Sequence, residues 1–110
     1  MSDGFEGEKA KFVRVWRGRT SHDKADACET YWLQNGVEPL KKRGAISVQM
    51  LRQDGPLETE FVTFSYWGSL EAMTGGSESD PTDTHHLDRD AEFLLELPKK
   101  VQVLKILASG

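Results

Sequence analysis

Apolar and polar residues alternate along three segments of the chain, and this alternation is typical of β-strands that are buried on one face. The segments are Lys11–Arg19, Gly44–Asp54 and the first part of Glu58–Met73. A fourth segment, Lys99–Leu107, is rich in valine, leucine and isoleucine and is also predicted to be a strand. An Asp-Gly-Pro turn signal at residues 54–56 separates the second and third segments, which are therefore predicted to form an antiparallel hairpin.

The stretch Glu58–Met73 has the aromatic and β-branched density of a strand that runs directly into a helix. Gly68 interrupts the strand, and Ser69 is expected to cap the short helix that follows. One face of the strand is predicted to pack in the core and carries Val62, Phe64 and Tyr66. The other face carries Phe61, Thr63, Ser65 and Trp67. This mixture of aromatic rings and small hydroxyls suits either the wall of a ligand cavity or a semi-polar sheet face without a ligand.

Apolar residues recur at helical spacing after the first strand. Thr20 is expected to cap a helix that runs to about Asn35, where Gly36 ends it. Its buried stripe is predicted to comprise Ala25, Cys28 and Trp32, with Tyr31 as a further candidate. A further short turn is expected over Val37–Lys42, and one or two helical turns over Asp88–Leu95. The inward-facing residues of this last helix are predicted to be Phe93 and Leu94.

The predicted order of strand, helix, strand, strand, helix and strand defines an α+β fold, the ferredoxin-like βαββαβ arrangement with a four-stranded antiparallel sheet. Two helices cover only one face of such a sheet. We assign to the helices the face that carries Val13, Val15, Val62 and Phe64. The opposite face then carries Phe12, Trp16, Leu51, Phe61 and Trp67. Because so much apolar surface is unfavourable in water, we expect a second copy of the chain to pack there in a homodimer.

Composition agrees with a single soluble domain. The chain has 110 residues, 37% hydrophobic and 29% charged, and we expect a disordered tail at residues 1–10 and one domain at residues 11–108. No apolar run approaches the ~20 residues that span a bilayer, and the net charge of −4 disfavours nucleic acid and anionic membranes as partners. The absence of a secretory signal and the single cysteine, Cys28, predict a cytoplasmic protein in which that thiol is packed in the core.

Several segments resemble one known family. The segments are VRVWRGRT, FSYWGSLEAM and HHLDRDAEFLLELP followed by VQVL, and they resemble the antibiotic biosynthesis monooxygenase family of dimeric α/β-barrel proteins. The resemblance covers nearly all of residues 11–107, and its most specific part is the W-x-S-x-E-A-M run at residues 67–73. It implies a homodimeric α/β barrel with a cavity between sheet and helices. Members are often cofactor-independent oxygenases that act on polycyclic phenols, quinols or anthrones.

The resemblance also suggests which residues contact a ligand. Trp67 matches the tryptophan that ends the third strand across the superfamily and faces the cavity in haem-degrading relatives, so we expect it to pack against a flat aromatic substrate. Trp16, Phe61 and Ser65 are expected to bind the same molecule. Arg14 shares a face with Trp16 and is expected to hold a phenolate or a carboxylate. The alternative for these residues is ordinary core packing and, for the arginine, a salt bridge.

His85 and His86 are the candidate catalytic bases, because histidine is the side chain whose ordinary pKa lies near neutrality. The alternative is a solvated pair of histidines in a loop. A metal site that adds Asp88 and Asp90 to these histidines is conceivable, but the spacing matches no specific motif. We therefore predict an acidic, solvated helix start with no metal and no bound cofactor.

The predicted function is that of a cofactor-independent monooxygenase that oxidises a flat aromatic or quinol-like molecule within a homodimer. The first alternative is a non-catalytic dimer of the same fold that captures a hydrophobic small molecule. The second is haem binding, because relatives of the same fold bind or degrade haem. Haem-degrading relatives carry an asparagine on the first strand, where this chain has Trp16 or Arg17, and this difference weakens the haem interpretation.

Overall fold

The computed structural model describes residues 10–75, 80–84 and 89–109. Its strands are β1 (Phe12–Thr20), β2 (Ser47–Asp54), β3 (Thr59–Trp67) and β4 (Gln102–Lys105). Its helices are α1 (His22–Asn35), α2 (Val37–Lys42), α3 (Leu70–Thr74) and α4 (Asp90–Phe93). The predicted tail lies outside the described residues except for Ala10, which is buried.

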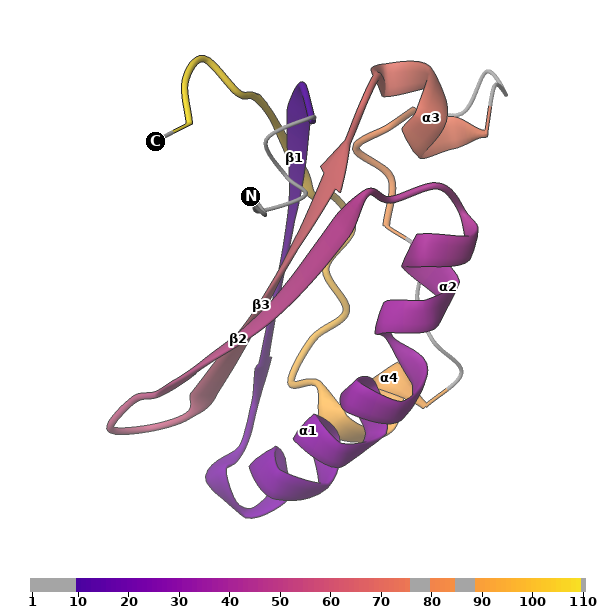
Figure 1. Ribbon diagram of the computed structural model, residues 1–110. Helices are drawn as coiled ribbons and strands as arrows, with labels where there is room; N and C mark the ends of the chain where they lie inside the picture. Colours follow the sequence, from indigo (N-terminus) through magenta and orange to yellow (C-terminus); the bar gives the residue numbers. More distant parts are fainter. Residues whose placement is uncertain (1–9, 76–79, 85–88, 110) are drawn as a thin grey trace, which may run out of the picture.

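The strands form one antiparallel sheet in the order β2-β3-β1-β4 (Figure 1). β1 pairs with β3 along its whole length, from Phe12 opposite Trp67 to Thr20 opposite Thr59. β4 is shorter than predicted and pairs only with the first part of β1. At the far end of β1, Leu94 forms an isolated bridge with Thr20. The predicted ferredoxin-like sheet is confirmed.

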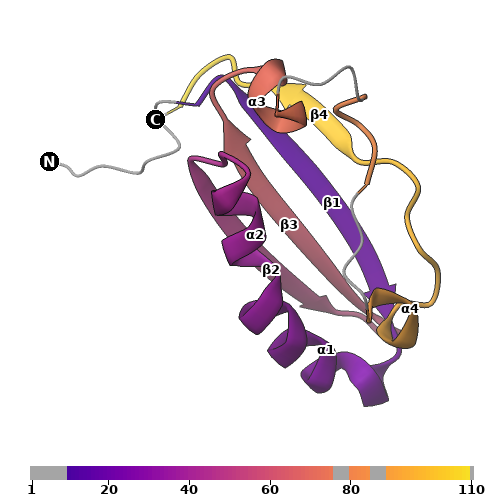
Figure 2. The same ribbon diagram turned by 90° about the vertical axis from the view of Figure 1, so that its right-hand side faces the viewer.

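Helices α1, α2 and α4 lie on one face of this sheet (Figures 1 and 2). The predicted stripe of α1 is confirmed for Ala25, Cys28 and Trp32, which are its buried residues. Tyr31 is only partly buried against the same cluster. Ser69 caps α3 as predicted, since its hydroxyl accepts a hydrogen bond from the Ala72 amide. Within the described part of the chain, no helix is long and apolar enough to cross a bilayer.

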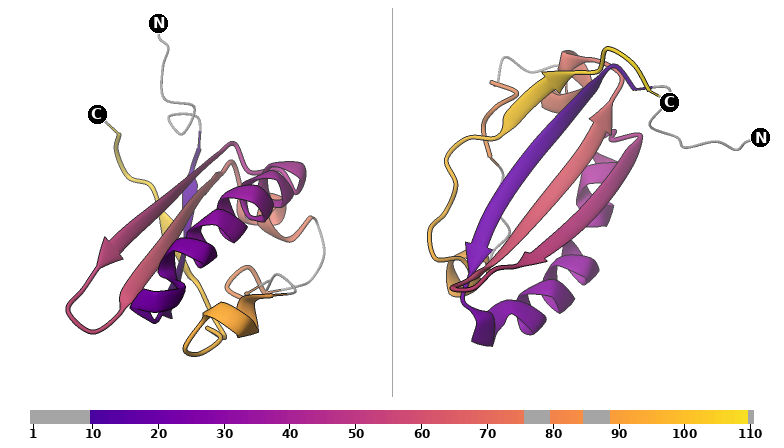
Figure 3. Two further views of the ribbon diagram at one scale, coloured as in Figure 1. Left: turned by 90° about the horizontal axis from the view of Figure 1, so that it is seen from below. Right: turned by 90° about the vertical axis from the view of Figure 1, so that its left-hand side faces the viewer.

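The helices cover the face that was predicted to be open. Two core clusters lie beneath them, one around Trp32 and Phe61 and the other around Ala45, Trp67 and Met73. The open face instead carries Val13, Val15, Leu51, Val62 and Phe64, which follows from the strand register (Figure 3, right). Both faces of β1 and β3 are apolar, so alternation alone did not identify the covered one. The large rings of Trp16, Phe61 and Trp67 fill the space between sheet and helices.

Thr20 does not cap α1, as the sequence had suggested. Ser21 occupies the cap position in extended backbone, and Thr20 is the last residue of β1. The Thr20 hydroxyl is fully buried and donates a hydrogen bond to the Phe93 carbonyl oxygen. This hydrogen bond joins the end of β1 to α4, next to the bridge between Thr20 and Leu94.

Gly18 makes room for the indole of Trp16 on the covered face of β1. A Cβ atom built on Gly18 would overlap Trp16 Cη2 and lie 3.0 Å from Leu94 Cδ2. A glycine inside a strand often marks such a close approach. The position of Trp16 therefore depends on the missing side chain two residues later.

Gly18→Ala is expected to lower the free energy of unfolding by about 1–3 kcal/mol, the usual cost of overpacking, because Trp16 or β1 must shift. Urea denaturation measures this change, and near-ultraviolet circular dichroism reports the altered tryptophan environment. Gly68→Ala is the matched control, because its nearest neighbour would be Ile46 Cδ1 at 3.9 Å, an ordinary contact. Equal stability of the two variants would contradict the prediction.

Candidate functional site

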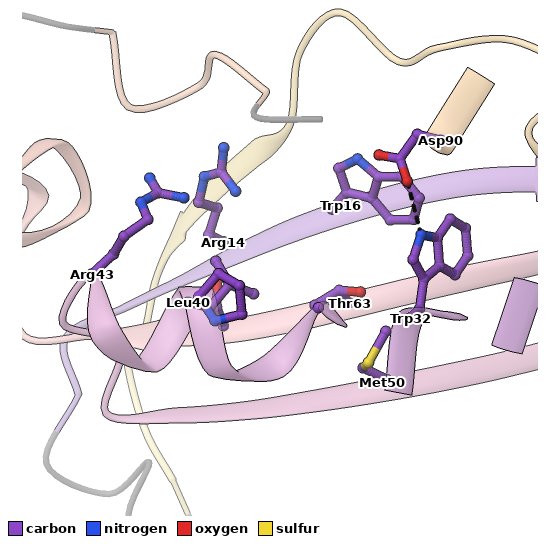
Figure 4. A pocket seen from close by; sticks show the side chains of 11 residues that line it. Arg14, Trp16, Trp32, Leu40, Arg43, Met50, Thr63 and Asp90 are labelled. Carbon is purple, nitrogen blue, oxygen red and sulfur yellow. Dashed lines mark hydrogen bonds between the residues drawn. The ribbon is translucent and has the colours of Figure 1, made fainter. Parts of the chain in front are cut away.

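A pocket of about 270 Å³ lies between the covered face of the sheet and the helices (Figure 4). Its floor is formed by Arg14 and Trp16 from β1 and by Thr63 and Ser65 from β3. An engineered apolar cavity of about 150 Å³ binds benzene, so this larger space suits a flat molecule with more than one ring. Position and size therefore agree with the cavity that the family resemblance implies.

Aromatic side chains form one wall of the pocket. The Trp32 ring meets Trp16 edge to face, with ring centroids 4.9 Å apart and planes at 86°, and it meets Phe61 with the same distance and angle. The Trp32 indole nitrogen donates a hydrogen bond of 2.9 Å to Asp90 Oδ1, which fixes the orientation of the ring. Such a rigid wall provides apolar surface for a flat ring.

Two arginines lie at the other end of the pocket (Figure 4). Arg14 is only 5% exposed, and its guanidinium group donates hydrogen bonds to the carbonyl oxygens of Pro81 and Asp83. Arg43 donates to the Met73 carbonyl oxygen at 3.1 Å and lies over the Trp67 ring. Burial, followed by the nearby charge of Arg43, lowers the pKa of Arg14 from its ordinary value to about 10. Arg14 therefore remains cationic near neutral pH, and Arg43 is cationic because an arginine side chain keeps its proton in proteins.

The predicted site residues fall into three groups. Arg14, Trp16 and Ser65 line the pocket. Phe61 and Trp67 are buried beside it in the two core clusters and are not among its lining residues. The Trp67 indole nitrogen donates a hydrogen bond of 2.9 Å to Ser65 Oγ. Trp67 therefore orients a hydroxyl that lines the pocket. The third group, His85 and His86, lies outside the described residues.

Several residues that line the pocket were not predicted to contact a ligand, and the most informative of them are Trp32, Arg43 and Asp90. Trp32 was expected to lie in the core. Because a buried indole N–H needs a hydrogen-bond acceptor, a carboxylate close to Trp32 could have been inferred from the sequence. Asp90 was expected to be solvated but is 3% exposed, which corrects that interpretation. Arg43 follows α2 directly and precedes Gly44, whose φ of 114° turns the chain toward β2. The residues around Gly44 contain no sequence pattern that predicts this turn.

Cys28 is a core residue, as predicted, because it is fully buried in the cluster around Trp32. Burial, followed by the charge of Asp90, raises the pKa of its thiol to about 12. Among the described residues, no group of three or more histidine, cysteine or acidic side chains is placed to hold a metal ion. The candidate metal set included His85, His86 and Asp88, which lie outside the described residues.

A short loop holds Arg14 in place. The Asp80 carboxylate accepts hydrogen bonds from the hydroxyl and the amide of Thr82 and from Lys100, and these contacts lower the pKa of Asp80 to about 2. The same loop presents the carbonyl oxygens of Pro81 and Asp83 to Arg14. The geometry of the cationic end therefore depends on an ionised Asp80.

The stabilisation from Asp80 is expected above the ordinary carboxyl pKa, and it should disappear as the pH falls from that value to about 2, because the folded pKa is the lower one. An NMR titration of the Thr82 amide measures this midpoint. Thr82→Val should raise the midpoint more than Lys100→Met does, since the Thr82 hydroxyl has the largest effect. An Asp80 that titrates at its ordinary value in the folded chain would refute the expectation.

Comparisons with known proteins support the fold. The sequence matches no known family model and no curated protein. The structure is similar to a crystal structure from Bacillus cereus that is described as a "putative antibiotic biosynthesis monooxygenase". The two share 14% sequence identity with a TM-score of 0.63, over 92% of this chain and 97% of the other. The ferredoxin-like α+β fold of the single chain, which the family resemblance implied, is therefore confirmed.

Proposed function

We propose that this protein binds a flat aromatic molecule in the pocket and oxidises it with molecular oxygen, without a bound cofactor. The observation that carries the proposal is the pocket itself, which has an aromatic wall at Trp16 and Trp32 and a cationic end at Arg14 and Arg43. The wall binds the rings of the substrate. The arginines stabilise negative charge that develops when the substrate loses a proton.

The proposed reaction converts a methylene carbon between two aromatic rings into a carbonyl. A base removes a proton from the substrate, and the resulting carbanion gives electrons directly to O2. One oxygen atom enters the new carbonyl group, and the other leaves as water with the two hydrogens of the methylene. All four electrons that reduce O2 come from the substrate, so the reaction balances without another reductant.

His85 and His86 are the proposed bases. Histidine accepts a proton near neutral pH at its ordinary pKa, and general base catalysis typically accelerates a reaction by about 10²–10⁴-fold. Trp67 and Phe61 position residues of the proposed site. The Trp67 indole donates a hydrogen bond to Ser65, and the Phe61 ring packs against Trp32.

Oxygen uptake with anthrone, measured with an oxygen electrode, is expected to consume one molecule of O2 for each anthraquinone formed. With ¹⁸O2, one labelled atom should appear in the product. Replacing the base, His85→Ala or His86→Ala, should lower the rate by about 100-fold or more. His22→Ala is the control, because the His22 ring contacts the Gly55 carbonyl oxygen at the β2–β3 hairpin, away from the pocket. If His85→Ala and His86→Ala leave the rate as unchanged as the control does, the proposal is contradicted.

A non-catalytic binding protein is the second candidate function. The observation that favours it is that the described residues lining the pocket include no histidine. Saturable binding of anthrone without oxygen uptake would support this candidate. A haem titration separates both candidates from the haem-binding alternative, which requires a shifted Soret band.

We also propose that the protein is a homodimer that associates through the open face of the sheet. No helix of the described residues covers this face (Figure 3, right), which carries half-buried Val13, Val62 and Phe64 and exposed Leu51 and Leu104. An apolar sheet face without a partner is unusual in a monomer. The face differs from the one that the sequence analysis assigned to the dimer, but the family resemblance supports the same assembly.

Phe64→Glu is expected to convert the proposed dimer into a monomer, because the substitution places a charge in the centre of the open face. Light scattering after size-exclusion chromatography measures the mass. Leu57→Glu is the control, since Leu57 is 89% exposed in the hairpin loop. The melting temperature of the unmodified protein should rise with concentration. A monomer whose melting is independent of concentration would refute the dimer.

A further inference from the structure

The cationic end of the pocket has no carboxylate partner among the described residues. The guanidinium groups of Arg14 and Arg43 donate only to carbonyl oxygens, those of Pro81, Asp83 and Met73. A carbonyl oxygen satisfies a hydrogen bond but supplies only a partial charge. Both side chains retain N–H donors beyond those these bonds use, because a guanidinium group offers donors on all three nitrogens.

Arg52 lies on the same face of the sheet as Arg14 and has different hydrogen-bond partners. Its guanidinium group pairs with three carboxylates, those of Asp26, Glu29 and Asp54, at 2.9–3.2 Å. These contacts raise its pKa, whereas Arg14 and Arg43 both have lowered pKa values because of burial. The Asp83 carboxylate attracts Arg14 through space but is itself paired with Lys100. The positive charge of the two arginines is therefore only partly compensated, in a place where water is partly excluded.

Two neighbouring cations in a partly buried site repel one another, and an anion placed between them removes this cost. The fork of each guanidinium group matches the two oxygens of a carboxylate. Next to this end, Ser65 and Thr63 offer hydroxyls, and beyond them the wall is formed by Trp16 and Trp32. The pocket is thus cationic at one end and aromatic at the other.

We propose that Arg14 and Arg43 form an anion-binding subsite, and that the ligand is an aromatic acid with fused rings. Its carboxylate or phenolate oxygen binds the two guanidinium groups, and its rings lie against Trp16 and Trp32. This inference rests on the proposed function and narrows it, because neutral aromatic molecules would leave the two charges unpaired. A bound phenol would also lose its proton more readily than in water.

Calorimetric titrations near neutral pH with 2-naphthoate and 2-naphthamide test the proposal, because the two probes have the same rings and nearly the same shape but only the first has an anionic head group. The anion is expected to bind at least about tenfold more tightly, as a charge-assisted hydrogen bond predicts. Arg43→Met should remove most of this preference and leave the affinity for the amide within about twofold. Lys41→Met is the control, since it removes one exposed charge from α2.

Arg14 is buried and holds the loop of Pro81 and Asp83, so Arg14→Lys serves as a second variant that keeps the charge and loses the fork. It should weaken naphthoate binding by less than Arg43→Met does. Titration with 2-naphthol distinguishes the two kinds of anion, because a bound phenolate shifts the naphthol absorption near neutral pH, whereas an unshifted spectrum restricts the subsite to carboxylates.

Equal affinity for naphthoate and naphthamide, or a preference that Arg43→Met leaves intact, would overturn the anion subsite while aromatic binding survives. A preference that Lys41→Met abolishes equally would also overturn it, since the effect would then come from the general charge of α2. If neither naphthoate nor naphthamide binds, the proposed function fails, and the inference that rests on it fails with it.

Discussion

The pairing of β1 with β3 is the constraint on which the rest of the structure depends. It joins the two strands over all nine residues of each, and a shift by one residue would exchange the two faces of both strands. In the observed register, Arg14, Trp16 and Ser65 lie beneath the helices, and Val13 and Phe64 lie on the open face. One hydrogen-bonded ladder thus sets both the floor of the pocket and the surface proposed for the dimer.

Most of the fold was predictable because its signals are local. The period of apolar residues located every strand, the helix His22–Asn35 and the turn Val37–Lys42, and Gly36 marked the junction between the two helices. The covered face of the sheet was not predictable in this way, since both faces are apolar. The decision between them depends on Trp32, whose ring packs against Trp16 and Phe61 from another element. Alternation along one strand contains no information about such a partner.

The pocket was predictable only where a strand supplies its residues. Alternation placed Arg14 and Trp16 on one face, and the structure brings both to the pocket. Arg43 and Asp90 enter through contacts that are distant in sequence, such as the hydrogen bond between Trp32 and Asp90 across 58 positions. The charge of Asp90 suggested a solvated residue, and its burial follows instead from the acceptor that the Trp32 indole needs.

Cys28 has a consequence for how the two layers of the fold separate. The thiol is fully buried beneath α1 and its pKa is raised to about 12, so it is almost never both exposed and ionised in the folded chain. Thiol reagents attack the exposed thiolate, and the sulfur therefore reacts in those molecules whose α1 has moved away from the sheet. The reaction rate of the single cysteine therefore reports how often α1 separates from the sheet. A ligand that contacts both β1 and the helices lowers this rate.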